Sequence, residues 1–308
     1  MKKLLLLSAF VLNAAFAQEQ ITVVNAQGPT QSMTPQVLKI VDEANRSQRK
    51  YKFVMEFKTG AFETIGVNAI QQDPQTQIVT VTNSIIEGAD RGLVNLNDYV
   101  PVFSFGDACW AVITNFGNTE QGLSSIPSSG IKEITVGGPA IGGAAHLVAL
   151  QIGKKFNIPV RYIVYRSNYD ALINMAGDNN SVNMVMDRLI NFKQMSLKNP
   201  KIQALALNCP ERIKEYSTIK TLKEQKIDSP YIWHFVLASS KMSRDKKQEI
   251  ENIFKDVVLA AGKDNMFAVS DFISPVFFSQ DSSTHYYKSV DTLKSYRKEY
   301  AAEIKKPN

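Results

Sequence analysis

The feature that most constrains the fold is a strand, a glycine-rich turn, a helix and a second strand in direct succession over residues 131–166. The turn carries Gly137, Gly138, Gly142 and Gly143, and glycine lets a backbone approach a ligand closely. The first turn of the helix offers N–H groups without intrahelical acceptors and the positive end of the helix dipole, which together favour an anion. An ordinary connection between a strand and a helix is the alternative interpretation of this turn.

The glycine turn lacks the residues of the common nucleotide-binding loops. No G-x-x-x-x-G-K-S/T phosphate loop and no G-x-G-x-x-G motif is completed. Three scattered histidines and two distant cysteines make no metal-ligand pattern, so we expect neither a metal nor another cofactor. The sequence therefore favours anion binding without nucleotide machinery.

Residues 1–17 have the pattern of a secretory signal peptide. Lys2 and Lys3 form its basic start, residues 4–11 its apolar core, and residues 15–17 (AFA) a cleavage site. The core is too short to span a bilayer, which takes about 18 apolar residues or more, and no cysteine follows it to carry a lipid anchor. We expect an exported, soluble, periplasmic protein that begins near residue 18.

The charge of the chain is mildly basic and spread out. The formal net charge of +6 becomes about +4 once the two lysines of the signal are removed. Lys241, Lys246 and Lys247 alternate with acidic residues, as on a solvated helix. No basic stripe with interleaved aromatics indicates a nucleic-acid surface, whereas a modest positive field helps to recruit small anions.

The two cysteines, Cys109 and Cys209, lie far apart in the sequence. They can pair as a disulfide in an oxidising compartment. Two buried free thiols are the alternative, and the sequence leaves both open.

Apolar runs alternate with helical patterns along most of the chain. A first series of strands and helices is expected over 21–25, 35–44, 51–57, 64–70 and 77–82. Two strands follow over 100–114 with a break at Gly106 and Asp107, and a second series is expected over 133–136, 145–156, 160–165, 169–176 and 202–207. Long helices over 244–261 and 290–304 complete the pattern. Two such α/β series predict two lobes with a ligand cleft at the carboxyl ends of their strands.

Several motifs occur together in a recognisable order. They are 55–61 (MEFKTGA), 136–148 (VGGPAIGGAAHLV), 158–167 (IPVRYIVYRS), 202–207 (IQALAL) with Arg212, and 221–224 (TLKE). Their order and spacing resemble the receptors of tripartite tricarboxylate transporters, the Bug family of periplasmic solute-binding proteins. The resemblance extends over nearly the whole mature chain.

The chain departs from the family pattern at three places. The first ligand loop of the family has paired glycines and an Asp, whereas residues 27–33 (QGPTQSM) have one glycine and no Asp. Phe62 and Glu63 replace glycines, and Tyr165 is followed by Arg-Ser-Asn in place of Lys-Gly. These departures affect the identity of the ligand and leave the expected fold unchanged.

The resemblance implies an α/β, two-lobed periplasmic-binding-protein fold of type II-like architecture. Lobe 1 is expected to comprise 18–104 with 228–308, and lobe 2 to comprise 105–227. The family holds a carboxylate largely through backbone N–H groups of two facing loops, often through water. By resemblance, this chain is therefore a monomeric receptor, not an enzyme, that captures a small organic anion and delivers it to integral membrane transporter subunits.

The expected ligand-binding residues lie in the two loops and at three further positions. They are Gly28, Pro29, Thr30, Gln31, Ser32, Asn83, Gly138, Pro139, Ala140, Ile141, Gly142, Gly143, Ala144, Asn168 and Asp187. Thr30 and Ser32 are alternatively helix caps, Asn83 a turn residue, and Asp187 one partner of a surface pair with Arg188. His146 is expected to orient or pack against the loop without touching the ligand.

Two other functions are open at this stage. A periplasmic ligand-sensing module that signals to a membrane sensor would use the same closed cleft. An exported hydrolase is the third class, but no G-x-S-x-G elbow occurs and no Ser-His-Asp motif context can be assembled.

Overall fold

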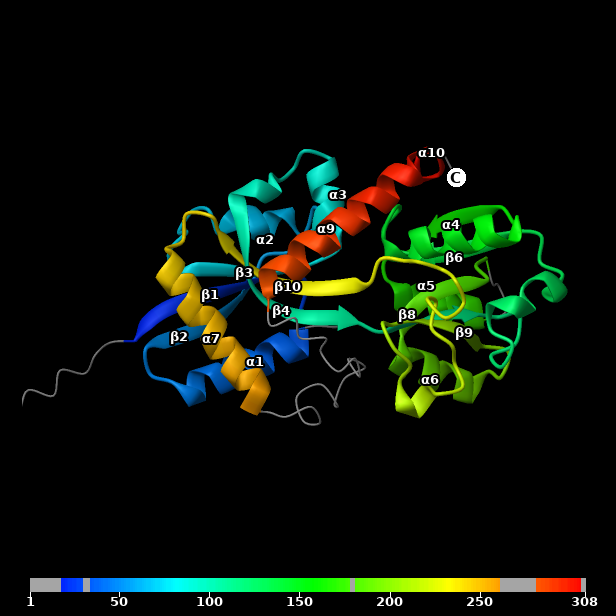
Figure 1. The fold of residues 1–308 in the computed structure, drawn as a ribbon, viewed down its shortest axis with the longest axis horizontal. Coiled ribbons are helices and arrows are strands. Elements are labelled where there is room, and N and C mark those ends of the chain that lie inside the picture. Colours follow the sequence, from blue (N-terminus) through cyan, green and yellow to red (C-terminus); the bar gives the residue numbers. More distant parts are fainter. Residues whose placement is uncertain (1–17, 30–33, 178–180, 261–280, 306–308) are drawn as a thin grey trace, which may run out of the picture.

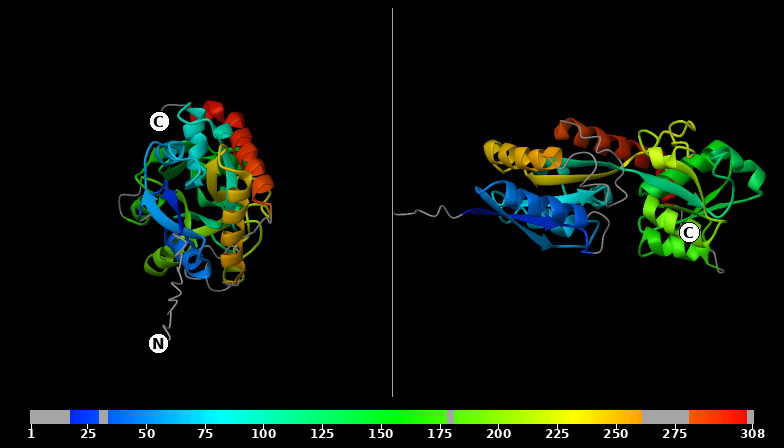
Figure 2. Two further views of the ribbon diagram at one scale, coloured as in Figure 1. Left: turned by 90° about the vertical axis from the view of Figure 1, so that its left-hand side faces the viewer. Right: turned by 90° about the horizontal axis from the view of Figure 1, so that it is seen from below.

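The computed structural model describes residues 18–29, 34–177, 181–260 and 281–305. The predicted signal peptide (1–17) and Thr30, Gln31 and Ser32 of the first loop lie outside the described residues. Two five-stranded sheets form two lobes that lie side by side along the longest axis (Figures 1 and 2). The predicted two-lobed α/β architecture is therefore confirmed.

The first sheet has the order β2-β1-β3-β10-β4. Its strands are β1 (Glu19–Asn25), β2 (Tyr51–Phe57), β3 (Gln77–Thr82), β4 (Tyr99–Ala108) and β10 (Ile232–Ser239). β1 is parallel to β2 and β3, whereas β10 lies antiparallel between β3 and β4. A strand from the end of the chain thus lies inside a sheet built mostly from its beginning.

The second sheet repeats this arrangement with the order β7-β6-β8-β5-β9. Its strands are β5 (Trp110–Thr114), β6 (Ile134–Gly138), β7 (Val160–Val164), β8 (Met184–Arg188) and β9 (Gln203–Asn208). β6 is parallel to β7 and β8, and β5 lies antiparallel between β8 and β9. Because parallel strands end at the same edge, the turns after β3 and β6 lie where such sheets bind ligands.

Helices cover both faces of the sheets. In the first lobe they are α1 (Thr34–Ser47), α2 (Thr64–Ala69), α3 (Ser84–Asp90), α7 (Arg244–Ala260), α9 (Ser282–Glu299) and α10 (Ala301–Ile304). In the second lobe they are α4 (Ala144–Phe156), α5 (Asn168–Ala176) and α6 (Leu189–Lys198). Short 3₁₀ turns occupy Leu96–Asp98, Leu123–Ser125, Pro127–Ser129 and Lys214–Tyr216. Figure 1 shows α9 reaching from the first lobe toward α4 of the second, and the two helices are in contact.

The core of the first lobe has two layers because side chains alternate between the faces of a strand. Ile21 and Val23 of β1 pack with Phe254 of α7 on one face. Val24 packs with Tyr286 of α9 on the other. All eight residues of β10 are buried, which suits a central strand covered on both faces.

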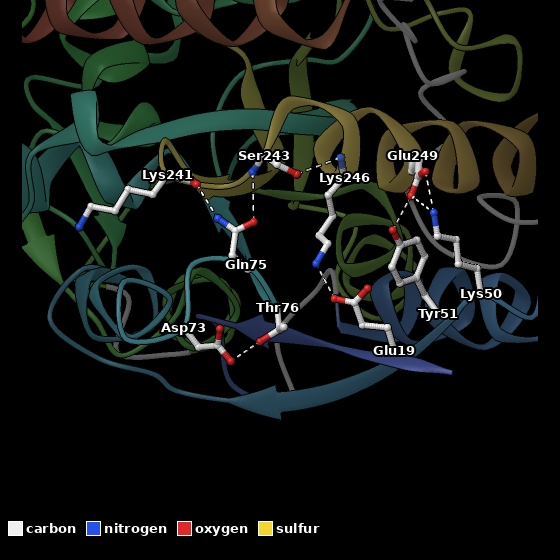
Figure 3. Close-up of polar contacts among 10 residues, drawn as sticks. All are labelled: Glu19, Lys50, Tyr51, Asp73, Gln75, Thr76, Lys241, Ser243, Lys246 and Glu249. Carbon is white, nitrogen blue, oxygen red and sulfur yellow. Dashed lines mark hydrogen bonds and ion pairs between the residues drawn. The ribbon is translucent and has the colours of Figure 1, made fainter. Parts of the chain in front are cut away.

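Polar contacts join α7 to the edge of the first sheet (Figure 3). Glu249 pairs with Lys50 at 2.6 Å and accepts a hydrogen bond from the Tyr51 hydroxyl, and Lys246 pairs with Glu19. Ser243 accepts a hydrogen bond from the Lys246 N–H at 3.4 Å, as an N-cap does. Exposed pairs such as Lys50–Glu249 contribute little, about 0–1 kcal/mol, so the apolar face of α7 supplies most of its attachment.

The chain passes from the first sheet to the second at Cys109. β4 continues unbroken through residues 106 and 107 and pairs with β10 as far as Ala108, so the break expected at Gly106 and Asp107 was misplaced. Cys109 and Cys209 form a disulfide beside the paired residues Trp110 and Asn208, with their Cα atoms 4.7 Å apart. The residue boundaries given above for the two lobes stay a prediction.

Candidate functional site

A cavity of about 170 Å³ lies between the lobes. The first lobe lines it with Gln27, Thr82, Asn83, Ser84, Glu87, Ile232, His234, Leu293 and Arg297. The second lobe lines it with Trp110, Pro139, Ala140, Gly142, Gly143, Ala144, Ala145, Tyr162 and Asn168. It is smaller than the roughly 300–1,000 Å³ of pockets for drug-sized ligands, so its size suits a small solute.

The glycine loop between β6 and α4 uses several of its own N–H groups. The Ala140 N–H donates to the Tyr162 hydroxyl at 3.2 Å, the Gly142 N–H to His146 Nδ1 at 3.0 Å, and the Gly143 N–H to the Ala140 carbonyl at 3.1 Å. Gly142 has φ +75°, where an L side chain is strained. This loop is therefore braced from within.

Helix α4 begins at the wall of the cavity. Ala144 and Ala145 are its first two residues and line the cavity, and N–H groups in the first turn have no intrahelical acceptor. Trp110, at the start of β5, lines the same cavity, and its buried Nε1–H has no partner among the described residues. Donors of this kind at the positive end of a helix dipole favour an anion.

His146 braces the loop from behind. Its ring packs on Tyr162 with centroids 4.6 Å apart, and it is not among the residues lining this cavity. Burial, with the nearby Arg297 charge, lowers the pKa of His146 to about 4, so the ring is neutral at neutral pH and Nδ1 can accept the Gly142 N–H. This position fits an orienting role.

Arg297 of α9 connects the two lobes at the cavity. Its Nη1 donates to the Gly142 carbonyl at 2.7 Å, and its Nε pairs with Asp90 at 2.5 Å. The ion pair offsets the charge of the guanidinium, whose side chain is only 13% exposed. Arg297 was not predicted as a site residue, because no local sequence pattern in the lysine- and glutamate-rich terminal helix indicates a contact with the glycine loop.

Two other residues at the cavity have unsatisfied buried acceptors. Glu87 Oε2 and Asn168 Oδ1 have no hydrogen-bond partner among the described residues, although Glu87 Oε1 pairs with Arg91 at 2.6 Å. Asn168 was predicted as a ligand-binding residue and does line the cavity. Glu87 was not predicted, because it lies in a short helix that the sequence pattern did not reveal.

A buried acid lies behind the first-lobe wall of the cavity. The Glu63 carboxylate accepts hydrogen bonds from the Thr82 N–H and hydroxyl, both at 2.7 Å, and from Gln27 Nε2 at 3.3 Å. Burial raises the pKa of Glu63 to about 7, although these hydrogen bonds lower it. Glu63 thus holds two residues of the cavity wall, Gln27 and Thr82.

The segment that carries Glu63 has an uncommon backbone. Ala61, Phe62 and Glu63 have φ of 45°, 59° and 70°, three successive residues in the left-handed region. Phe62 and Glu63 are the residues that replace glycines of the family pattern. The Arg91 guanidinium lies 4.4 Å from the centre of the Phe62 ring, so this segment also supports the Arg91–Glu87 pair.

The remaining predicted residues are placed as follows. Asn83 lines the cavity, but its Nδ2 donates to the Tyr231 carbonyl and its Oδ1 accepts from the Trp233 N–H, both at 2.9 Å, so it joins β3 to β10. Asp187 is buried, accepts hydrogen bonds from the Arg188 N–H and Asn191, and does not line the cavity. The other predicted residues that do not line it are Gly28, Pro29, Gly138 and Ile141.

Metal-ligand clusters and membrane-spanning helices are both absent from the part of the chain that the structure describes. The described residues contain no group of three or more His, Cys, Asp and Glu side chains that could hold a metal ion. Within the same ranges, no helix is both long and apolar enough to cross a membrane.

The chain resembles solved solute-binding proteins in structure. A TctC solute-binding protein from Polaromonas superimposes with a TM-score of 0.70 at 14% identity, covering 92% of this chain and 99% of that one. An R. palustris protein with adipate gives 0.70 at 16% identity, covering 92% and 97%. MatC from Rhodopseudomonas palustris with bound malate gives 0.61 at 13%, covering 89% and 99%.

No protein-family model matches the chain, and no curated protein matches it in sequence. At these low identities the structural likeness shows the fold, which is that of two-lobed periplasmic solute-binding proteins such as TctC.

Proposed function

We propose that this protein is an exported receptor of the tripartite tricarboxylate type that captures a small carboxylate in its interlobe cavity and delivers it to a membrane transporter. The observation that carries the proposal is the set of unpaired donors at the cavity, namely the first N–H groups of α4 and the Trp110 Nε1–H. Proteins of the same fold have been solved with adipate and with malate, which supports a carboxylate ligand.

The cavity walls explain why capture needs two lobes. Donors for the carboxylate lie on the second lobe, whereas Glu87, Thr82 and Arg297 face them from the first. Neither lobe alone surrounds the cavity, so binding and release require a hinge movement between them. Thr30 and Ser32 are proposed to add hydroxyl contacts, each worth about 0.5–1.5 kcal/mol.

A ligand screen tests this proposal. Titration calorimetry and thermal shift of the mature protein are carried out with malate, adipate, citrate, amino acids, phosphate and sulfate. A carboxylate at a hundredfold excess over its Kd should stabilise the protein by about 2.7 kcal/mol. A rise in melting temperature with a metal ion or a nucleotide only would contradict the proposal.

A pair of tryptophan variants locates the anion. Trp110→Phe removes the unpaired indole N–H at the cavity and should weaken carboxylate binding about tenfold or more, since a hydrogen bond to a charged group is worth about 1.5–3 kcal/mol. Trp233→Phe is the matched control, because its indole N–H is also buried and unpaired but does not line the cavity. Equal affinities of the two variants would place the carboxylate elsewhere.

A further inference from the structure

The proposed function leaves one feature of the cavity unexplained, namely a buried acid with one carboxylate oxygen that lacks a hydrogen-bond partner among the described residues. Glu87 is 5% exposed; Oε1 pairs with Arg91, and Oε2 has no partner among the described residues. Asn168 Oδ1 is a second buried acceptor without a partner there, on the opposite lobe. Buried acceptors are costly when left unpaired, so both are groups that a ligand would satisfy.

The same cavity has no spare positive charge. Arg297 is the cation among the described residues that line it, and Asp90 already pairs with Arg297. Burial lowers the pKa of His234, which also lines the cavity, to about 3, so this ring is neutral at neutral pH. A second carboxylate on the solute would therefore meet the unpaired Glu87 Oε2 without a further cation beside it, because Arg91 and Arg297 already pair with Glu87 and Asp90.

We infer that the natural solute carries one carboxylate and one protonated amine, and that Glu87, with Asn168, is the specificity-determining acceptor for the amine. The inference rests on the proposed function and narrows its ligand class to amino acids, as opposed to di- and tricarboxylates. An ammonium group has three donors and no acceptor, so one such group has donors for both unpaired oxygens. A hydroxyl has a single donor and can therefore satisfy only one of the two oxygens.

Two matched series of solutes test the inference by titration calorimetry. The first is butyrate, 4-hydroxybutyrate, 4-aminobutyrate and glutarate, and the second is propionate, lactate, alanine and methylmalonate. In at least one series the amine should bind at least tenfold more tightly than the dicarboxylate. Tighter binding of the dicarboxylate in both series would overturn the inference and leave the proposed receptor function standing.

Substitution of Glu87 assigns the preference to this side chain. Glu87→Gln should weaken binding of the preferred amine at least tenfold while the plain monocarboxylate of that series changes less than twofold. Glu120→Gln is the control, because Glu120 is an exposed acid outside the cavity. A preference for the amine that is unchanged in Glu87→Gln would overturn the assignment.

A second variant keeps the test decisive if Glu87→Gln fails to fold. Asn168→Asp places a second acid at the cavity, and an acidic residue is favoured in the first turn of a helix such as α5. It should strengthen binding of the amine and weaken binding of the dicarboxylate, and the opposite change would count against the inference. If none of these solutes binds, nor malate, adipate or citrate, the proposed function falls together with this inference.

Discussion

The glycine loop at the cavity and the segment 61–63 behind its first-lobe wall both adopt left-handed backbone, and they do so with opposite residue choices. In the second lobe Gly142 supplies φ +75°, and a Cβ there would lie 2.6 Å from Arg297 Nη1. In the first lobe Ala61, Phe62 and Glu63 take φ of 45° to 70° with full side chains. Gly142 lets the Arg297 guanidinium approach the loop closely. The first-lobe segment instead adopts a less favourable backbone conformation and places a buried acid and an aromatic ring behind the cavity wall.

Gly142→Val gives the largest effect expected from this comparison. Valine resists φ > 0, and its Cβ would displace the Arg297 guanidinium, so loop and helix start would shift together. We expect carboxylate affinity to fall at least a thousandfold, about 4 kcal/mol, in titration calorimetry of a folded protein. Gly130→Val is the control, because Gly130 also has φ +76° but a Cβ there meets nothing within 4 Å.

Substitution of the adjacent glycine, Gly143, separates the effect of backbone conformation from the effect of the space available for a side chain. Gly143 has φ −74° and ψ 174°, which any residue adopts, and its Cβ would lie 3.1 Å from the Ala140 carbonyl oxygen. The backbone angles therefore predict a smaller loss of affinity for Gly143→Val than for Gly142→Val. Unchanged affinity in both variants would show that the loop is an ordinary connection between a strand and a helix.

The residues that line the cavity also differ in how far the sequence predicts them. The glycine turn was found from local residues, because strand, glycines and helix follow one another within 131–166. Glu87 and Arg297 left no such signal: α3 is only seven residues long, and Arg297 reaches Gly142 across 155 positions of sequence. Local pattern therefore predicted the glycine loop, whereas tertiary packing brings Glu87, Arg297 and Trp110 to the cavity.

The same limit applies to the fold. β1, β2 and β3 were predicted because their apolar residues are bounded by turns and helices. No strand was predicted over Met184–Arg188 or Ile232–Ser239, although the latter is entirely buried at the centre of its sheet. Its neighbours β3 and β4 come from the beginning of the chain, and no local pattern encodes such pairing.

The buried acid of the first-lobe segment gives a pH dependence opposite in sign to that of His146, which braces the glycine loop and has a lowered pKa. The pKa of Glu63 is raised in the folded protein to about 7 from 4.5, so the folded state binds this proton more tightly than the unfolded chain. Its stabilising contribution is complete below about pH 4.5 and is lost as the pH rises through about 7. The loss amounts to about 3 kcal/mol at most.

Urea unfolding between pH 5 and pH 8 measures this contribution. His146 and His234, whose pKa values are lowered by burial, add a rise in stability up to about pH 6.5 to both proteins, so the difference between the proteins isolates Glu63. Relative to Glu63→Gln, which cannot ionise there, the wild-type protein should lose up to about 3 kcal/mol of its free energy of unfolding as the pH rises from 5 to 8. Glu43→Gln is the control, since Glu43 lies on α1 with its side chain 41% exposed and paired with Arg46 on the surface. Profiles of the same slope for Glu63→Gln and wild type would show that Glu63 does not carry the effect.

The smallest expected effect tests the backbone of the first-lobe segment directly. Ala61 is exposed at φ 45°, where an L residue costs about 1–2 kcal/mol more than in its preferred regions. Ala61→Gly should therefore stabilise the protein by up to about 1 kcal/mol, against the usual direction of an alanine-to-glycine change. Urea unfolding at fixed pH measures it, with ligand affinity expected to stay unchanged.

An exposed helical alanine provides the contrast for this last prediction. Ala302→Gly in α10 should destabilise by about 1 kcal/mol or less, because glycine loses more backbone freedom when it folds into a helix. Opposite signs for the two variants would show that the first-lobe segment retains its left-handed conformation against a backbone cost. If Ala61→Gly destabilises as Ala302→Gly does, the conformation costs little, and the contrast with the glycine loop would lie in side-chain contacts alone.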